Sequence, residues 1–235
     1  MRETFYLDGV DALSAGIELQ APIEFSEPIP IVETDLIDGR NGELIYETGS
    51  YENRTATASC FALKENVLTA MNTVNRFLLS KHGYRRLETS DAPDSFWMAR
   101  IENGARVEQR ARTLAPFEIE FSCKPQRFLK VGEDSVSFNA PSSIYNQYFY
   151  DAKPFVTIYG IGSGKVYIGG NIIDILSMDG VLYIDSETMN AYNENGNQNR
   201  NVKINNFPVL KDGENLIAFD GNIASVTIKP RWWVL

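Results

Sequence analysis

The stretch P-F-E-I-E-F-S-C, residues 116–123, alternates apolar and polar side chains without interruption. Successive side chains of a β-strand point to opposite faces, so Phe117, Ile119, Phe121 and Cys123 are expected to line one apolar face. A second run, V-T-I-K-P-R-W-W-V-L at 226–235, places its apolar residues Val226, Ile228, Trp232 and Val234 in one phase as well. Both runs predict strands that bury one face.

Turn signals lie on both sides of these runs. Asp-Gly occurs at 8–9, 38–39, 179–180, 212–213 and 220–221, and Asn-Gly at 41–42, 103–104 and 195–196. Such pairs favour tight hairpin turns, so the chain is predicted to be mostly antiparallel β. The run G-I-G-S-G-K, residues 160–165, lacks the spacing of a phosphate loop or a dinucleotide fingerprint and is interpreted as one more hairpin turn.

One segment follows a different period. Residues 64–83, K-E-N-V-L-T-A-M-N-T-V-N-R-F-L-L-S-K-H-G, carry apolar side chains at positions 67, 68, 71, 74, 77 and 78. This spacing predicts one amphipathic helix packed across a sheet. Gly83 suits the position just past the helix end, and Lys81 and His82 would complement the helix dipole.

The polar stretch K-P-Q-R-F-L-K-V-G-E-D-S, residues 124–135, is interpreted as a domain junction that follows a strand. We therefore expect a first domain at 1–130, β-dominated with one helix, and a second at 131–235, a β-sandwich of short strands. The Asn-rich run at 193–201 is expected to be an exposed loop.

Composition excludes several classes of protein. The chain has 235 residues and a net charge of −9, so it lacks the positive field that sequence-independent nucleic-acid binding requires. It has no apolar run of membrane-spanning length and no secretory h-region at its start, which favours synthesis in a cytoplasm. Cys60 and Cys123 are expected to be buried thiols, and with His82 as its one histidine the chain offers no metal site.

The stretch Y-I-D-S-E-T-M-N-A-Y, residues 183–192, raises the question of catalysis, because Asp185 and Glu187 are two residues apart. In a strand both carboxylates would share one face, roughly 6.6 Å apart, and glycosidases use paired carboxylates at about 5–9 Å. A glycosidase also needs a lined cleft, which one strand end cannot supply. We therefore expect the pair to be non-catalytic.

Several segments together resemble the distal tail protein (Dit) family of long-tailed phages. They are F-Y-L-D-G at the start, G-R-N-G (39–42), Y-E-N-R (51–54), the helix at 64–83, F-E-I-E-F-S-C-K-P (117–125), K-P-F-V-T-I-Y-G (153–160), Y-I-D-S-E-T-M-N-A-Y (183–192), F-P-V-L-K-D-G-E-N (207–215) and I-K-P-R-W-W-V-L (228–235). The resemblance lies in their order and spacing across nearly the whole chain.

This resemblance implies a mainly β, two-domain virion structural protein of the tail tip or baseplate. Its N-terminal β-sandwich-like domain would form a hexameric ring with one helix per subunit, and its C-terminal domain would be a galectin-like β-sandwich. The implied partners are further copies of the chain (a homo-hexamer, possibly in stacked rings), the major tail tube protein, a tail-associated fibre or lysin protein and a receptor-binding protein. No cofactor and no enzymatic activity are implied, and DNA would pass through the ring without specific binding.

Site candidates follow from the same segments. The G-R-N-G and Y-E-N-R loops are richer in Arg and Asn than solvated turns need, which favours a subunit contact at Arg40, Asn41, Tyr51, Asn53 and Arg54. Outer docking candidates are Asp185, Glu187, Asn190 and Tyr192. An alternative function is a carbohydrate-binding module for cell-wall saccharide, for which Tyr183, Tyr192, Trp232 and Trp233 offer aromatic rings.

Overall fold

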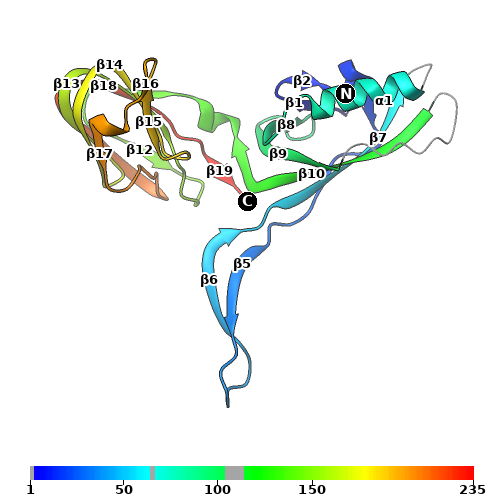
Figure 1. Ribbon diagram of the computed structural model, residues 1–235. Coiled ribbons are helices and arrows are strands. Elements are labelled where there is room, and N and C mark those ends of the chain that lie inside the picture. Colours follow the sequence, from blue (N-terminus) through cyan, green and yellow to red (C-terminus); the bar gives the residue numbers. More distant parts are fainter. Residues whose placement is uncertain (1–2, 64–66, 104–113) are drawn as a thin grey trace. The chain divides into compact units, whose positions relative to one another are not determined.

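The computed structural model describes residues 3–63, 67–103 and 114–235 (Figure 1). One compact unit runs to Arg127 and includes Leu235, and the other spans Phe128–Val234. Strands dominate both units, and the described residues contain a single α-helix. The mainly β fold predicted from the sequence is confirmed.

The first unit is built on a curved antiparallel sheet. Its strand order is β2-β1-β8-β9-β10-β7-β3, with β4 paired to β7; β19, which pairs with the long strand β10, belongs to the second unit. The bounds are β1 Phe5–Leu7, β2 Val10–Asp11, β3 Ile17–Leu19, β4 Glu24–Phe25, β7 Arg54–Leu63, β8 Arg85–Thr89, β9 Ser95–Asn103, β10 Leu114–Leu129 and β19 Trp233–Val234. The rings of Phe5 in β1 and Phe121 in β10 meet edge to face at 5.9 Å, although β8 and β9 lie between their strands. The sheet therefore curls around its core.

The alternation of residues 117–123 is confirmed. Phe117, Ile119, Phe121 and Cys123 are all buried on one face of β10. This strand does not end there: it continues through residues 124–129, where the sequence predicted a junction, and the division of the chain between Arg127 and Phe128 falls within it.

The predicted helix exists, but it is shorter than residues 64–83. Helix α1 spans Val67–Leu79, and residues 64–66 lie outside the described part of the chain. Val74 and Leu78 are buried in the core beneath it. Gly83 has a left-handed φ of +84°, but it lies four residues beyond the last helical residue and not just past the helix end as predicted.

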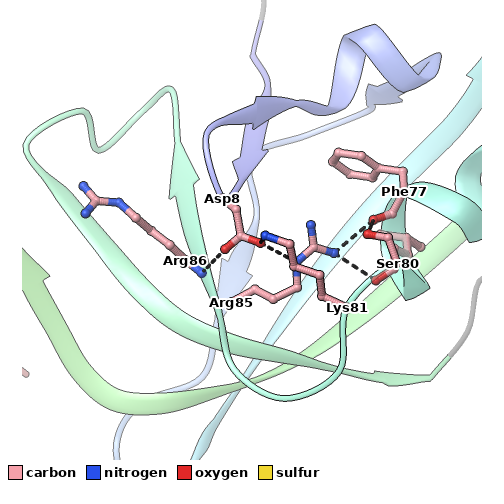
Figure 2. Close-up of polar contacts among 7 residues, drawn as sticks. Asp8, Phe77, Ser80, Lys81, Arg85 and Arg86 are labelled. Atoms are coloured by element: carbon pink, nitrogen blue, oxygen red, sulfur yellow. Dashed lines mark hydrogen bonds and ion pairs between the residues drawn. The ribbon is translucent and has the colours of Figure 1, made fainter. Parts of the chain in front are cut away.

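Arg85, rather than Lys81 or His82, supplies the positive charge that contacts the end of α1 (Figure 2). Its Nη1 donates to the carbonyl oxygens of Phe77 and Leu78 at 2.9 and 3.0 Å. Its Nε donates to Asp8 Oδ2 at 3.0 Å, and the same oxygen accepts from Lys81 Nζ at 3.0 Å. Two of the carbonyls in the last helical turn are thus satisfied from β8.

A two-stranded hairpin extends from the first unit. Strands β5 (Pro30–Asp35) and β6 (Leu44–Tyr51) pair with each other and form a sheet of their own (Figure 1). We call residues 29–51 the arm.

The second unit is a sandwich made from three long strands, β13 (Phe155–Ile168), β14 (Asn171–Asp185) and β18 (Gly213–Lys229). The sheet order is β11-β18-β13-β14-β15-β16, with β12 on β18 and β17 on β14. The short elements are η2 Lys130–Glu133, β11 Val136–Phe138, β12 Ser142–Asn146, β15 Asn190–Asn193, β16 Gly196–Asn197, η3 Asn199–Asn201 and β17 Val202–Ile204. Buried residues from both halves of each long strand pack in one core. Each long strand therefore contributes to both layers of the sandwich.

The glycine-rich run 160–165 is not a hairpin turn, which corrects the sequence-based interpretation. It lies inside β13, at a register shift where that strand bends. Asp179-Gly180 and Asp220-Gly221 lie inside β14 and β18 at the same level, because Gly160 pairs with Gly180 and Gly164 with Gly221. A Cβ on Gly164 would stand 2.5 Å from the carbonyl oxygen of Asp220, so the bend requires glycine.

Candidate functional site

The tip of the arm carries two of the five predicted contact residues. Arg40 and Asn41 lie in the exposed loop between β5 and β6. The backbone N–H of Arg40 donates to the carbonyl of Ile37 at 3.1 Å, which fixes the turn while the guanidinium remains in solvent.

The arm also exposes more apolar surface than a solvated hairpin needs. Leu36 is 84% exposed and Ile45 is 61% exposed. The exposed large apolar residues of the arm are Ile29, Ile31, Val32, Leu36, Ile37, Ile45 and Tyr46. An isolated two-stranded hairpin is marginally stable in water, and exposed apolar patches mark interaction sites. Sequence reasoning missed this surface, although the apolar runs on either side of D-G-R-N-G predict a hairpin.

The other three predicted contact residues lie at the base of the arm. Tyr51 is half-buried opposite Pro30, and Arg54 is the first residue of β7. Asn53 Nδ2 donates to Tyr84 Oη at 2.7 Å and to Ser122 Oγ at 3.0 Å. Asn53 is therefore committed to fixing the base, and the predicted set divides between the two ends of one hairpin.

In the second unit, the structure separates the two carboxylates of residues 183–192. Strand β14 ends at Asp185, and Glu187 lies in the turn before β15, so the two do not share the face of a strand. Asp185 Oδ1 accepts from Arg231 Nη1 at 2.6 Å, and Glu187 lies 3.6 Å from Lys153 Nζ. Each carboxylate is thus paired with its own cation.

The environment of Asp185 favours its charged form. Burial raises the pKa of this carboxyl, but the hydrogen bond and charge of Arg231 and the backbone N–H of Glu187 lower it, and the net pKa is below its ordinary value. A general acid needs the opposite shift, toward neutral pH. Asp185 is therefore suited to holding Arg231, whose backbone has an unusual positive φ of 59°.

The remaining docking candidates belong to a polar and aromatic outer face. Asn190 Oδ1 accepts from Asn197 Nδ2 at 2.9 Å. The ring of Tyr192 lies 5.5 Å from that of Tyr183, which stacks on Phe155 at 5.8 Å. These rings cover one another across β13, β14 and β15.

The two tryptophans have different environments. Trp232 is buried in the core of the second unit. Trp233 is half-buried, stacks on Tyr150 at 4.5 Å and donates its indole N–H to the carbonyl of Asp151 at 3.0 Å. Each ring is already engaged within the chain, so the two tryptophans do not form one open platform.

Both cysteines are free and buried, as predicted. Burial raises the pKa of each thiol to about 12, although the charge of Arg54 opposes the shift at Cys123. Such thiols are poor nucleophiles. Among residues 3–63, 67–103 and 114–235, no cluster of three His, Cys, Asp or Glu side chains could hold a metal ion. In the same part of the chain, no helix has the length and apolarity to cross a membrane.

Comparison with known proteins gives a match at the level of the fold. No family model and no curated protein matches the sequence. A solved structure does match: the crystal structure of SPP1 Dit (gp 19.1), described as a paradigm of the hub adsorption apparatus in phages that infect Gram-positive bacteria. The TM-score is 0.72 at 14% sequence identity, and the match covers 97% of this chain and 98% of that one. The chain therefore has the fold of SPP1 Dit, a phage distal tail hub protein.

Proposed function

We propose that this chain is a structural, non-catalytic hub protein in the tail tip of a long-tailed phage or prophage. The observation that carries the proposal is the match to SPP1 Dit, because it spans both units and leaves almost none of either chain unmatched. In this proposal the first unit forms a hexameric ring that continues the tail tube. The second unit holds host-recognition proteins of the virion, through candidates that include Glu187, Asn190 and Tyr192.

The arm supports self-assembly on physical grounds. Among the described strands, β5 and β6 pair only with each other, and the apolar side chains of the arm face water in the single chain. Burying them against a neighbouring subunit removes that surface from water and protects the edges of the hairpin. The proposed partners beyond the chain itself are a tail tube protein, a tail fibre or lysin protein and a receptor-binding protein.

Particle mass tests the ring. We expect purified protein to form a species of about 158 kDa, six copies of the 26.4 kDa chain, in mass photometry or light scattering. Replacing two arm residues, Leu36→Ser with Ile45→Ser, should leave monomers with unchanged circular dichroism.

A matched control uses the second unit. Ile161 and Leu216 are 71% and 67% exposed, so Ile161→Ser with Leu216→Ser removes comparable apolar surface away from the arm. This variant should assemble like the wild type. A wild-type protein that stays monomeric at all concentrations, alone and with tail partners, contradicts the proposal.

Carbohydrate binding is the second candidate function, and its support is the outer aromatic face formed by Phe155, Tyr183 and Tyr192. A glycan array with the purified protein tests it directly. Binding that is lost in Tyr183→Ala and Tyr192→Ala would establish this function beside the hub role.

A further inference from the structure

Two arginines of the first unit lack the partners that half-buried guanidinium groups need. Arg54 begins β7, and Arg127 lies near the end of β10. The Nε atom of each is buried and has no hydrogen-bond partner. Within the described part of the chain, neither guanidinium makes an ion pair. The terminal Nη groups of both arginines are not buried, so an acceptor from outside the chain can reach them and stabilise a charge that the described part of the chain leaves unpaired.

The strand register places the two side chains on one face of the sheet, because Arg54 pairs with Cys123 and Arg127 lies four residues further along β10. Desolvation lowers the pKa of Arg54, and the charge of Arg127 lowers it further, while Glu27 and Cys123 raise it. Glu27 is exposed and is not within ion-pair distance of Arg54. The site therefore has two guanidinium cations, and no carboxylate of the described residues lies within ion-pair distance of either one.

An aromatic stack holds Arg54 in place. Its guanidinium lies over the ring of Phe25, 5.3 Å from the centroid, and Phe25 stacks on Trp97 at 4.2 Å. Among the described residues, the terminal Nη groups of Arg54 make no hydrogen bond or ion pair besides this contact. Two Nη groups match a carboxylate, which arginine can bind through two parallel hydrogen bonds.

The arm offers the complementary charge. Residues 29–51 contain five carboxylates and one basic residue, Arg40. All five carboxylates are exposed and lie among the exposed apolar side chains of the arm, and none makes an ion pair with another described residue. They are Glu33, Asp35, Asp38, Glu43 and Glu47.

The arm does not reach the arginines of its own chain. Glu47 is the last of its carboxylates and lies seven positions before Arg54. At about 3.3 Å per residue the extended chain spans roughly 23 Å, more than two side chains bridge. A second copy can present the same carboxylates from outside.

We propose that Arg54 and Arg127 form the receptor for carboxylates on the arm of a second copy of this chain, so that subunits join head to tail. This inference rests on the proposed ring, and it deepens it by naming both halves of the contact. Because the two surfaces differ, the interface is heterologous, the type that generates closed rings or open filaments.

Two complementary variants test the inference. The receptor variant carries Arg54→Gln and Arg127→Gln. The arm variant carries Glu33→Gln, Asp35→Asn, Asp38→Asn, Glu43→Gln and Glu47→Gln. Each alone should remain monomeric at concentrations where the wild type assembles, with a dissociation constant raised at least about tenfold. An equal mixture should stop at dimers of about 53 kDa, twice the 26.4 kDa chain, because only one intact arm can meet one intact receptor.

Controls separate this contact from misfolding and from net charge. Arg100→Gln with Arg200→Gln changes the charge equally and should assemble normally. The receptor variant should keep the circular dichroism spectrum of the wild type and elute as a folded monomer. Loss of that spectrum would assign the two arginines to the fold and overturn the inference.

The outcomes also distinguish this inference from the ring itself. If the wild type assembles and the receptor variant assembles equally well, or if the mixture stays monomeric, the arginine receptor is wrong and the ring stands. If the wild type never assembles, both are wrong.

Discussion

Asp185 and Glu187 are two residues apart in sequence, yet their side chains have different environments. Asp185 is buried and accepts hydrogen bonds from Arg231 and from the backbone N–H of Glu187. Glu187 is exposed and pairs with Lys153 in the solvent. Removing the first carboxylate leaves a guanidinium without its acceptor, whereas removing the second changes little.

We expect Asp185→Asn to lower the free energy of unfolding by about 1–3 kcal/mol at neutral pH, and Glu187→Gln to change it by less than about 0.5 kcal/mol. The pKa of Asp185 is lowered in the folded protein. Its contribution is therefore complete above the ordinary carboxyl pKa of about 3.9 and is lost as the pH falls through the lower folded value. Urea denaturation at pH 7 and near pH 3 measures this: the gap between wild type and Asp185→Asn should shrink in acid. An equal loss in both variants would refute the assignment.

At the scale of elements, helix α1 depends on a residue that is not part of it. Arg85 is 6% exposed and joins the last carbonyls of the helix to Asp8 (Figure 2). Arg85→Met keeps the aliphatic stem but removes these hydrogen bonds, so we expect a loss of about 2–4 kcal/mol and faster hydrogen exchange in the last turn of α1. Lys81 pairs with the same carboxylate from a side chain that is 64% exposed. Lys81→Met should therefore cost less than about 1 kcal/mol. Equal effects of the two substitutions would show that the carbonyl contacts are unimportant.

The bend of the second unit gives another prediction for an element. A Cβ on Gly164 would meet the Asp220 carbonyl oxygen at 2.5 Å and the Ile223 side chain at 2.8 Å, and paired strands prevent either backbone from moving away. We expect Gly164→Ala to cost about 3–4 kcal/mol. Gly170 has a φ of +83° and nothing within 4 Å of its ideal Cβ, so Gly170→Ala should cost only the left-handed penalty of about 1–2 kcal/mol. Thermal unfolding of both variants checks the order, and a reversed order would contradict the steric argument.

Some features of these elements could be predicted from the sequence, and others could not. The burial of Phe117, Ile119 and Phe121 could be predicted because alternation is a local property. Gly180 and Gly221 have the positive φ that their Asp-Gly pairs predict, at 83° and 70°. The same φ serves a hairpin turn or a bulge inside a strand, and only the neighbouring strands decide which.

Contacts between residues that are far apart in the chain could not be predicted from the sequence, because no local pattern identifies both partners. Arg231 and Asp185 are 46 residues apart, and Arg85 reaches Asp8 across 77 residues. The arm was missed because an apolar strand is normally buried, and no local pattern indicates that its apolar residues lie in solvent. The candidates Arg40 and Arg54 were selected for composition, and composition does not show that they lie at opposite ends of the arm.

At the scale of the whole molecule, charge limits what a ring of these subunits can do. Residues 1–127, which contain the proposed ring-forming unit, hold 14 Lys and Arg against 20 Asp and Glu, so they carry −6 of the net −9. Six whole chains would carry about −54, screened beyond a Debye length of roughly 8 Å. A channel through which a polyanion passes must not bind many of its phosphates, because each phosphate contact adds affinity through counterion release. We therefore predict an acidic or neutral lumen, with most of the 22 Lys and Arg on outer or contact surfaces.

Binding to DNA tests this prediction without a structure of the ring. Fluorescence anisotropy with a short labelled duplex in low salt should show no binding at protein concentrations up to about 100 µM, the weak limit of ordinary non-specific affinity. A basic DNA-binding protein serves as the positive control under the same conditions. Assembly must be confirmed in the same sample, because a monomer has no lumen. Micromolar affinity for DNA that weakens with added salt would contradict the prediction, and so would a basic lumen in a cryo-EM map of the ring. A basic channel would bind the phosphates of the genome, and an acidic channel lacks those contacts.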